Sequence, residues 1–121
     1  MKSLLLLLLP FFITATTLAQ GTEATPSERF PSLPPFTIQG LDSSNFTKAD
    51  LSKNKKTLIM YFSPGCDHCQ HETEALLKDI ELFKDVQIVM ASYQPIEEIA
   101  GFHKKYNLAN YPQIKIGRDT N

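Results

Sequence analysis

Two stretches of this 121-residue chain are apolar at nearly every position, and amphipathic segments separate and follow them. Residues 57–62 and 86–93 are the apolar runs, and continuous apolar runs of this length are typical of parallel strands buried on both faces. We therefore expect two central strands of a parallel sheet, with Tyr61, Phe62 and Tyr93 in the core.

The segment between the two runs has the period of an α-helix. From residue 66 to about Lys84, seven side chains fall within a third of the helix circumference, namely Cys66, Cys69, Thr73, Leu76, Leu77, Ile80 and Phe83. A second helix is predicted from Pro95 to Lys105, with a buried stripe made by Ile96, Ile99, Phe102 and Tyr106. Strand, helix, strand and helix in this order predict an α/β fold with a βαβ core and a right-handed crossover.

Shorter elements flank this core. Residues 36–39 and 44–47 alternate around a turn at residues 40–43, which predicts an N-terminal β-hairpin, and residues 48–53 allow one helical turn. A further strand is predicted from Tyr111 to Ile116, beginning at a proline. Only five residues follow it, so we expect the domain formed by residues 34–121 to be incomplete at its C-terminus.

The first twenty residues have the composition of a secretory signal. Lys2 precedes an apolar region. Thr17-Leu18-Ala19 resembles the small-residue sequence at which signal peptides are cleaved. We expect a signal peptide over residues 1–19, a proline-rich linker over residues 20–33, and an exported, periplasmic or extracellular protein. Loss of Lys2 leaves 11 basic and 13 acidic residues, a net charge of 11 − 13 = −2, and nothing indicates nucleic-acid binding.

Both cysteines of the chain lie in Cys66-Asp67-His68-Cys69, directly after an apolar strand and at the start of a helix. Residues three apart on a helix share a face, so the two sulfurs can form a disulfide. The helix N-terminus stabilises an anion, which makes Cys66 the candidate nucleophile and Cys69 the resolving thiol. Protonated His68 would favour the Cys66 thiolate and Asp67 would oppose it, so the sign of their combined effect stays open.

These residues resemble the thioredoxin superfamily, and more closely the exported TlpA/ResA-like thiol-disulfide oxidoreductases with a redoxin, or AhpC/TSA-like, domain. The resemblance spans about residues 34–116 and rests on residues 34–38 followed by 41–42, on residues 46–51, and on residues 61–69 around the cysteines. It implies catalysis by Cys66 and Cys69, protein thiol or disulfide substrates, no bound cofactor, and an upstream electron donor such as a membrane thiol reductase.

The same resemblance implies a cis-proline that faces the cysteines and binds substrate. Pro112 is the candidate within this sequence. An earlier strand can carry a similar proline in TlpA-like chains, and the substrate-binding proline would then lie beyond Asn121.

A metal site is the first alternative, because Cys66, His68, Cys69 and His71 are four potential ligands for zinc or copper within six residues. On one helix, however, the two histidines project from other faces than the cysteines, and four ligands from so short a stretch do not readily form a tetrahedron, so we assign no metal-binding residue.

Two further alternatives remain. Residues 63–66 match part of a peroxiredoxin pattern, although Ile59 stands where that pattern has proline. The chain could also be an inactive thioredoxin-like module.

Overall fold

A computed structural model describes residues 25–29 and 32–120. The predicted signal peptide lies outside the described residues, and the described part of the chain contains no helix long and apolar enough to cross a membrane. A short helix, α1 (Pro26–Arg29), falls within the segment predicted as a linker. The elements from Ser32 onward form one compact unit.

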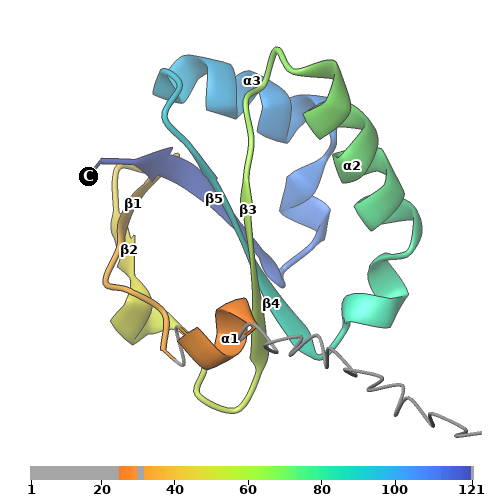
Figure 1. Ribbon diagram of the computed structural model, residues 1–121. Coiled ribbons are helices and arrows are strands. Elements are labelled where there is room, and N and C mark those ends of the chain that lie inside the picture. The colour runs from red at the N-terminus through yellow and green to blue at the C-terminus, as the bar shows by residue number, and fades with distance from the viewer. Residues whose placement is uncertain (1–24, 30–31, 121) are drawn as a thin grey trace, which may run out of the picture. The chain divides into compact units, whose positions relative to one another are not determined.

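The unit is built on a mixed five-stranded sheet with the order β2-β1-β5-β4-β3 (Figure 1). The parallel part consists of β3 (Lys56–Tyr61), β4 (Val86–Ser92) and β5 (Ile114–Asp119). The hairpin of β1 (Thr37–Gly40) and β2 (Asn45–Thr47) continues the sheet, because β1 pairs antiparallel with β5. The α/β fold with an N-terminal hairpin is therefore confirmed.

Two helices connect the parallel strands and pack on one face of the sheet. They are α2 (Asp67–Lys78), between β3 and β4, and α3 (Ile96–Lys105), between β4 and β5. The buried core on this face includes Ile88 and Met90 from β4 and Ile99 and Phe102 from α3. The predicted helical stripes are confirmed, because Thr73, Leu76, Ile80, Ile99 and Phe102 are all buried.

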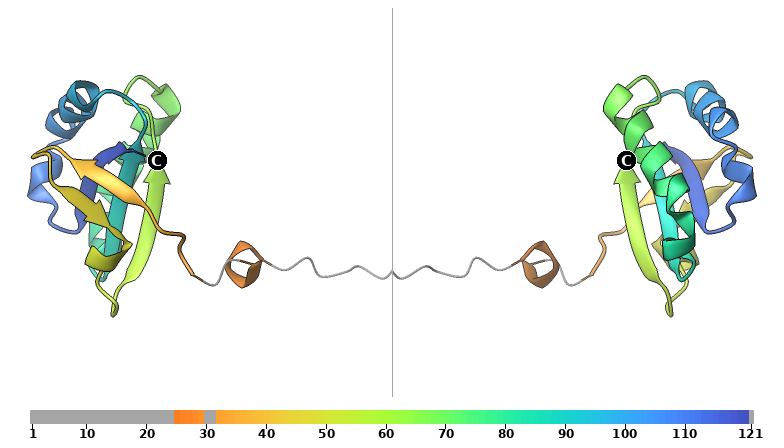
Figure 2. Two further views of the ribbon diagram at one scale, coloured as in Figure 1. Left: turned by 90° about the vertical axis from the view of Figure 1, so that its left-hand side faces the viewer. Right: turned by 90° about the vertical axis from the view of Figure 1, so that its right-hand side faces the viewer.

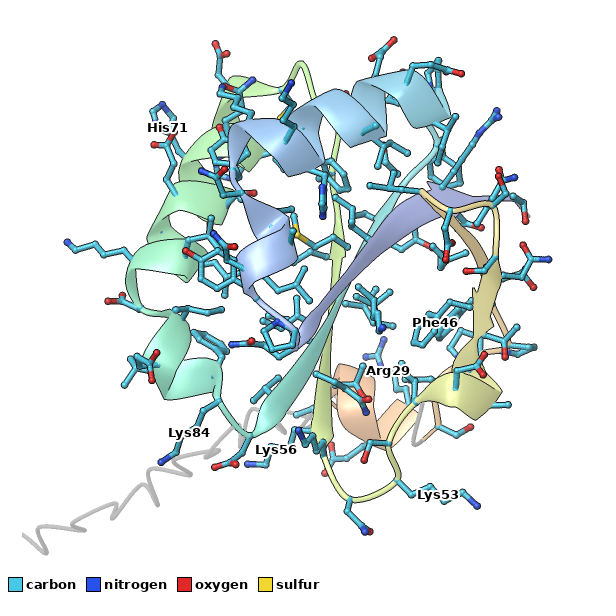
Figure 3. All side chains as sticks on the ribbon, turned by 180° about the vertical axis from the view of Figure 1, so that it is seen from behind. Arg29, Phe46, Lys53, Lys56, His71 and Lys84 are labelled. Carbon is cyan, nitrogen blue, oxygen red and sulfur yellow. The ribbon has the colours of Figure 1, made fainter. Side chains whose placement is uncertain are left out.

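A smaller apolar cluster lies on the opposite face of the sheet. Ile38 of the hairpin is buried there with Val89 and Ala91 of β4, and Phe36 and Phe46 pack against them. Figure 2 shows the hairpin in front of the parallel strands in the left view and α2 in front of them in the right view, and Figure 3 shows Phe46 pointing from β2 toward the sheet. The twisted hairpin thus covers part of the face that the helices leave open.

The prediction of two central strands is correct for β4 and wrong for β3. All the described strands beyond β4 assemble on the side away from β3, so β3 lies at the edge of the described sheet. Phe62 is buried, but Tyr61 and Tyr93 are 55% and 62% exposed and stack on each other with ring centroids 5.6 Å apart. The expectation that both tyrosines are core residues is therefore wrong.

The first predicted helix ends earlier than expected. The α-helix stops at Lys78, and a 3₁₀ helix, η2 (Ile80–Phe83), follows Asp79, whose φ of −106° and ψ of 21° leave the helical region. Aspartate competes for backbone hydrogen bonds and is a weak helix former, which favours a break at this position. The tighter turn still buries Ile80 against the core.

The last predicted strand starts later and runs further than expected. Tyr111 to Gln113 form a turn, closed by a hydrogen bond from the Ile114 N–H to the Tyr111 carbonyl at 2.9 Å. The strand then continues to Asp119, because its second half pairs with both β4 and β1. Lys48–Asp50 form a single 3₁₀ turn, η1, capped by Thr47.

Candidate active site

The two cysteines lie at the carboxyl end of β3, where the chain turns into α2. The Cys66 N–H donates to the Ser63 carbonyl at 3.0 Å, so residues 63–66 form a tight turn in which Pro64 and Gly65 take the two central positions. Cys66 has extended backbone angles and is the N-cap residue of α2, while Cys69 lies within the first turn. Both side chains are half-buried.

The Cys66 sulfur replaces the oxygen that usually caps a helix. It accepts a hydrogen bond from the Cys69 backbone N–H at 3.3 Å and another from the Cys69 thiol at 2.6 Å. A sulfur in this position satisfies one of the free N–H groups of the first helical turn and faces the positive end of the helix dipole. The two sulfurs lie close together as predicted, but both cysteines are free thiols in this structure and the predicted disulfide is not formed.

These contacts separate the acidities of the two thiols. The hydrogen bond from the Cys69 thiol is the main cause that lowers the pKa of Cys66, and the backbone N–H groups of Cys69 and His68 act in the same direction. The pKa of Cys69 is raised, chiefly because its proton is donated to Cys66. The pair is thus arranged for Cys66 to be the thiolate and Cys69 to hold the proton.

The two residues between the cysteines are exposed. The Asp67 carboxylate raises the pKa of Cys66, so it opposes the hydrogen bonds, although it is the smallest of these influences. The His68 ring lies 4.0 Å from a Glu72 carboxylate oxygen, one helical turn along α2. The His68 side chain is therefore directed along the helix surface.

The remaining residues of the proposed metal set are not gathered around the sulfurs. The His71 ring lies 3.8 Å from a Glu74 carboxylate oxygen and projects from the outer side of α2 (Figure 3). Among the residues that the structure describes, no three histidine, cysteine, aspartate or glutamate side chains are placed to hold a metal ion.

Pro112 lies at the opposite end of the sheet from the cysteines. It precedes β5 and lines a shallow pocket with Ser52, Lys55 and Gln87, at the edge where β3 and β4 begin. The peptide bonds of the described residues are all trans. The structure thus does not bring Pro112 to the cysteine pair.

Gln70 and Lys105, two polar residues that no sequence motif marks, form contacts beside the cysteine loop. The Gln70 side chain donates to the Pro64 carbonyl at 2.9 Å and accepts a hydrogen bond from the Lys105 ammonium at 2.7 Å. Lys105 is in the last turn of α3, 35 residues away in sequence. No pattern in the sequence links these two positions, because the contact depends on how α3 packs against α2.

Residues 31–115 match the AhpC/TSA family. Among curated proteins, the chain is 28% identical over 83 residues to protein disulfide isomerase-like 2-2 of Oryza sativa subsp. japonica, covering 68% of this chain and 22% of that protein. It is 29% identical over 82 residues to a protein disulfide-isomerase of Drosophila melanogaster, covering 67% and 16%. The chain therefore spans about a quarter or less of the length of these relatives.

Solved structures with a similar backbone establish the thioredoxin-like fold. The thioredoxin domain of a thiol-disulfide oxidoreductase from Bacteroides vulgatus matches with a TM-score of 0.58 and 24% identity, covering 70% of this chain and 59% of that chain. A secreted Mycobacterium tuberculosis disulfide oxidoreductase homologous to E. coli DsbE matches with a TM-score of 0.56 and 23% identity, covering 69% and 59%. Arabidopsis thaliana ScoI with copper bound has a TM-score of 0.56 and 21% identity, covering 70% and 56%.

Proposed function

Because this chain belongs to the AhpC/TSA family and has a thioredoxin-like fold, we propose that it is a thiol-disulfide oxidoreductase acting through Cys66 and Cys69. The observation that carries the proposal is the Cys66 sulfur at the N-cap of α2, which accepts hydrogen bonds from both the N–H and the thiol of Cys69. A thiolate is the reactive form in disulfide exchange, and these contacts favour it at Cys66. The names of the curated relatives agree with disulfide chemistry.

The reaction follows from the different protonation of the two thiols. The Cys66 thiolate attacks one sulfur of a substrate disulfide, forms a mixed disulfide, and releases the other substrate sulfur as a thiolate. Cys69 then gives up its proton to that thiolate or to solvent and attacks the Cys66 sulfur, which releases the second substrate sulfur. Two electrons pass from the cysteine pair to the substrate, which leaves a Cys66–Cys69 disulfide and a reduced dithiol.

The proposed direction is reduction of protein disulfides. The two cysteines carry the electrons themselves, so the reaction needs no bound cofactor. Each turnover leaves a disulfide that an upstream donor must reduce again, and a membrane thiol reductase would supply these electrons to an exported protein. The resemblance to the exported TlpA/ResA-like oxidoreductases supports this direction and this donor.

We place the protein outside the cytoplasm, with a signal peptide over residues 1–19, a linker over residues 20–33 and the thioredoxin-like domain from residue 34. The apolar N-terminal sequence supports this assignment. Expression in a secreting bacterial host, followed by N-terminal sequencing, is expected to yield a chain that begins at Gln20. An unprocessed N-terminus in the cytoplasmic fraction would contradict it.

The reduction potential of the cysteine pair tests the activity and its direction together. The purified protein is equilibrated with glutathione or dithiothreitol redox buffers, and the fraction of disulfide is measured by alkylation and mass spectrometry. A potential of about −270 mV or lower is expected for a reductant, and a value near −120 mV would reverse the direction. Absence of a reversible Cys66–Cys69 couple would refute the oxidoreductase function.

Trapping the intermediate tests which cysteine attacks. With Cys69→Ser, a mixed disulfide with a model protein substrate is expected to accumulate on Cys66, because the resolving thiol is missing. The matched variant Cys66→Ser is expected to trap no substrate. Equal trapping by both variants would contradict the assignment of the nucleophile.

The two cysteine variants also test the alternative functions, metal binding and peroxidase activity. Copper or zinc bound after purification under reducing conditions, and lost in Cys66→Ser, would favour a metal-binding function. Consumption of hydrogen peroxide that persists in Cys69→Ser would favour a peroxidase. We expect neither, because the two histidines contact Glu72 and Glu74 rather than the sulfurs, and because Ile59 stands in place of a proline.

A further inference from the structure

We propose that Gln70 and Lys105 are positioning residues that hold the loop of the attacking thiol, a role that rests on the function proposed above. Gln70 contacts the loop on both sides of the Gly65–Cys66 bond. Its backbone N–H donates to the Cys66 carbonyl at 3.0 Å, and its side-chain amide donates to the Pro64 carbonyl at 2.9 Å. One residue thus fixes the chain immediately before and after the point where Cys66 begins.

Lys105 determines which way the Gln70 amide points. An ammonium group only donates hydrogen bonds, so it must face the amide oxygen, and it lies 2.7 Å from that oxygen. The amide nitrogen is then left for the Pro64 carbonyl. Without Lys105, the amide could rotate and present its oxygen to the carbonyl, and the clamp on the loop would be lost.

The packing of α3 on α2 holds Lys105 in place. The Lys105 ammonium lies 5.0 Å from the ring centre of Tyr106, which is a favourable cation–π distance. The Tyr106 hydroxyl in turn donates to a Glu74 carboxylate oxygen at 3.4 Å. The C-terminal end of α3 is therefore tied to α2 at two points, through Tyr106 with Glu74 and through Lys105 with Gln70.

The position of the loop matters for the chemistry because the Cys66 thiolate is stabilised only while its sulfur stays in hydrogen-bond contact with Cys69. Its sulfur must accept from the Cys69 N–H and the Cys69 thiol together, at 3.3 and 2.6 Å. A loop that moves relative to α2 lengthens both contacts and weakens the stabilisation of the thiolate. Gln70 and Lys105 act through this geometry and do not touch the reacting sulfur.

The test compares the alkylation of Cys66 in four proteins, namely wild type, Lys105→Met, Gln70→Leu and the control Lys104→Met. Lys104 is the exposed neighbour of Lys105, so its replacement removes the same charge while the contact to Gln70 stays. Alkylation at Cys66 is followed against pH by mass spectrometry with fragmentation, and thermal unfolding confirms that each variant is folded. Asp67 and His68 are unchanged throughout.

Lys105→Met and Gln70→Leu are expected to shift the pH midpoint of Cys66 alkylation upward, while Lys104→Met matches the wild type. At a pH below the midpoint, the rate is expected to fall about three- to tenfold, the size that follows from loss of one hydrogen bond. A fifth protein, the double variant Gln70→Leu with Lys105→Met, is expected to equal Gln70→Leu alone, because Lys105 acts through Gln70.

Coinciding midpoints in all four folded proteins would overturn the inference, as would fully additive effects in the double variant. These results differ from a failure of the proposed function. A wild-type protein without a reversible disulfide couple refutes the oxidoreductase, but its alkylation profile still tests whether Gln70 and Lys105 position Cys66.

Discussion

Gly117 is the position where the structure makes its sharpest prediction about stability. It lies in β5 between two neighbours, paired with Gly40 of β1 on one side and with Ala91 of β4 on the other. A Cβ atom built at Gly117 would be 2.2 Å from the Gln39 carbonyl oxygen and 2.7 Å from the Cγ2 atom of Ile38. The backbone of β1 occupies this space, so Gly117→Ala cannot be accommodated by turning a side chain.

The cost follows from the distance that the strands must move. To restore an ordinary van der Waals contact, β1 and β5 must separate by about 1 Å. The N···O distances between the strands, usually about 2.9 Å, would then exceed the normal range for a hydrogen bond. Each lost hydrogen bond costs about 0.5–1.5 kcal/mol, and the buried side chain of Ile38 loses part of its cover as well. We expect Gly117→Ala to lower the free energy of unfolding by about 3 kcal/mol.

Gly101 provides the matched control. It lies in the interior of α3, and a Cβ atom there would meet no atom within 4 Å beyond its chain neighbours and the backbone of its own helix. Gly101→Ala is therefore expected to raise the free energy of unfolding by up to about 1 kcal/mol, through helix propensity. The same substitution should thus have opposite signs at the two positions.

Urea denaturation of the reduced full-length chain, followed by circular dichroism, measures both effects. With a typical slope for a small domain, the midpoint of Gly117→Ala is expected to fall by more than about 1 M. If Gly117→Ala unfolds within about 0.5 kcal/mol of the wild type, the close approach of β1 to β5 is refuted. An equal loss in Gly101→Ala would show that the effect is not steric.

Three further predictions follow from the buried and polar contacts. The alkylation rate of Cys66 is expected to rise with pH through a midpoint below the ordinary thiol pKa of about 8.5. Cys69→Ala should move this midpoint upward, because it removes the main hydrogen-bond donor to the Cys66 sulfur, and an unchanged midpoint would contradict this. Ile99 is fully buried, so Ile99→Ala is expected to lower the free energy of unfolding, measured by urea denaturation, by about 2–5 kcal/mol, and Ile99→Val by only about 0.5–1.5 kcal/mol. Equal losses would show that the site is not tightly packed. Gln87→Leu removes two hydrogen bonds to the backbone of Ser52, at 2.8 and 2.9 Å, and is expected to cost about 1–3 kcal/mol and to speed proteolysis of the following loop; unaltered cleavage would show that the loop does not depend on Gln87.

Periodicity predicted the elements whose burial is decided within their own sequence. The stripe of α3 was correct because Ile99 and Phe102 recur at helical spacing and both face the sheet. The spacing of Cys66 and Cys69 likewise placed their sulfurs together, since positions three apart on a helix share one face. Local geometry was sufficient in both cases.

Features that depend on distant parts of the chain could not be predicted in this way. The extension of β5 to Asp119 depends on pairing with the hairpin, about 80 residues earlier in the chain. The exposure of Tyr61 depends on which side of β3 the other strands occupy. The contact between Lys105 and Gln70 depends on the packing of two helices. None of these leaves a repeating pattern in the sequence.

The hydrogen bond that caps α2 depends on the redox state of the cysteine pair. In the reduced chain, the Cys69 amide N–H donates to the Cys66 sulfur, whose lowered pKa favours the thiolate. Once that sulfur is bonded to Cys69 or to a substrate it carries no charge, so the first turn of the helix loses its best acceptor and frays more readily. The rate at which the Cys69 backbone amide exchanges with heavy water should therefore report, without any added probe, whether the cysteine pair is reduced or oxidised.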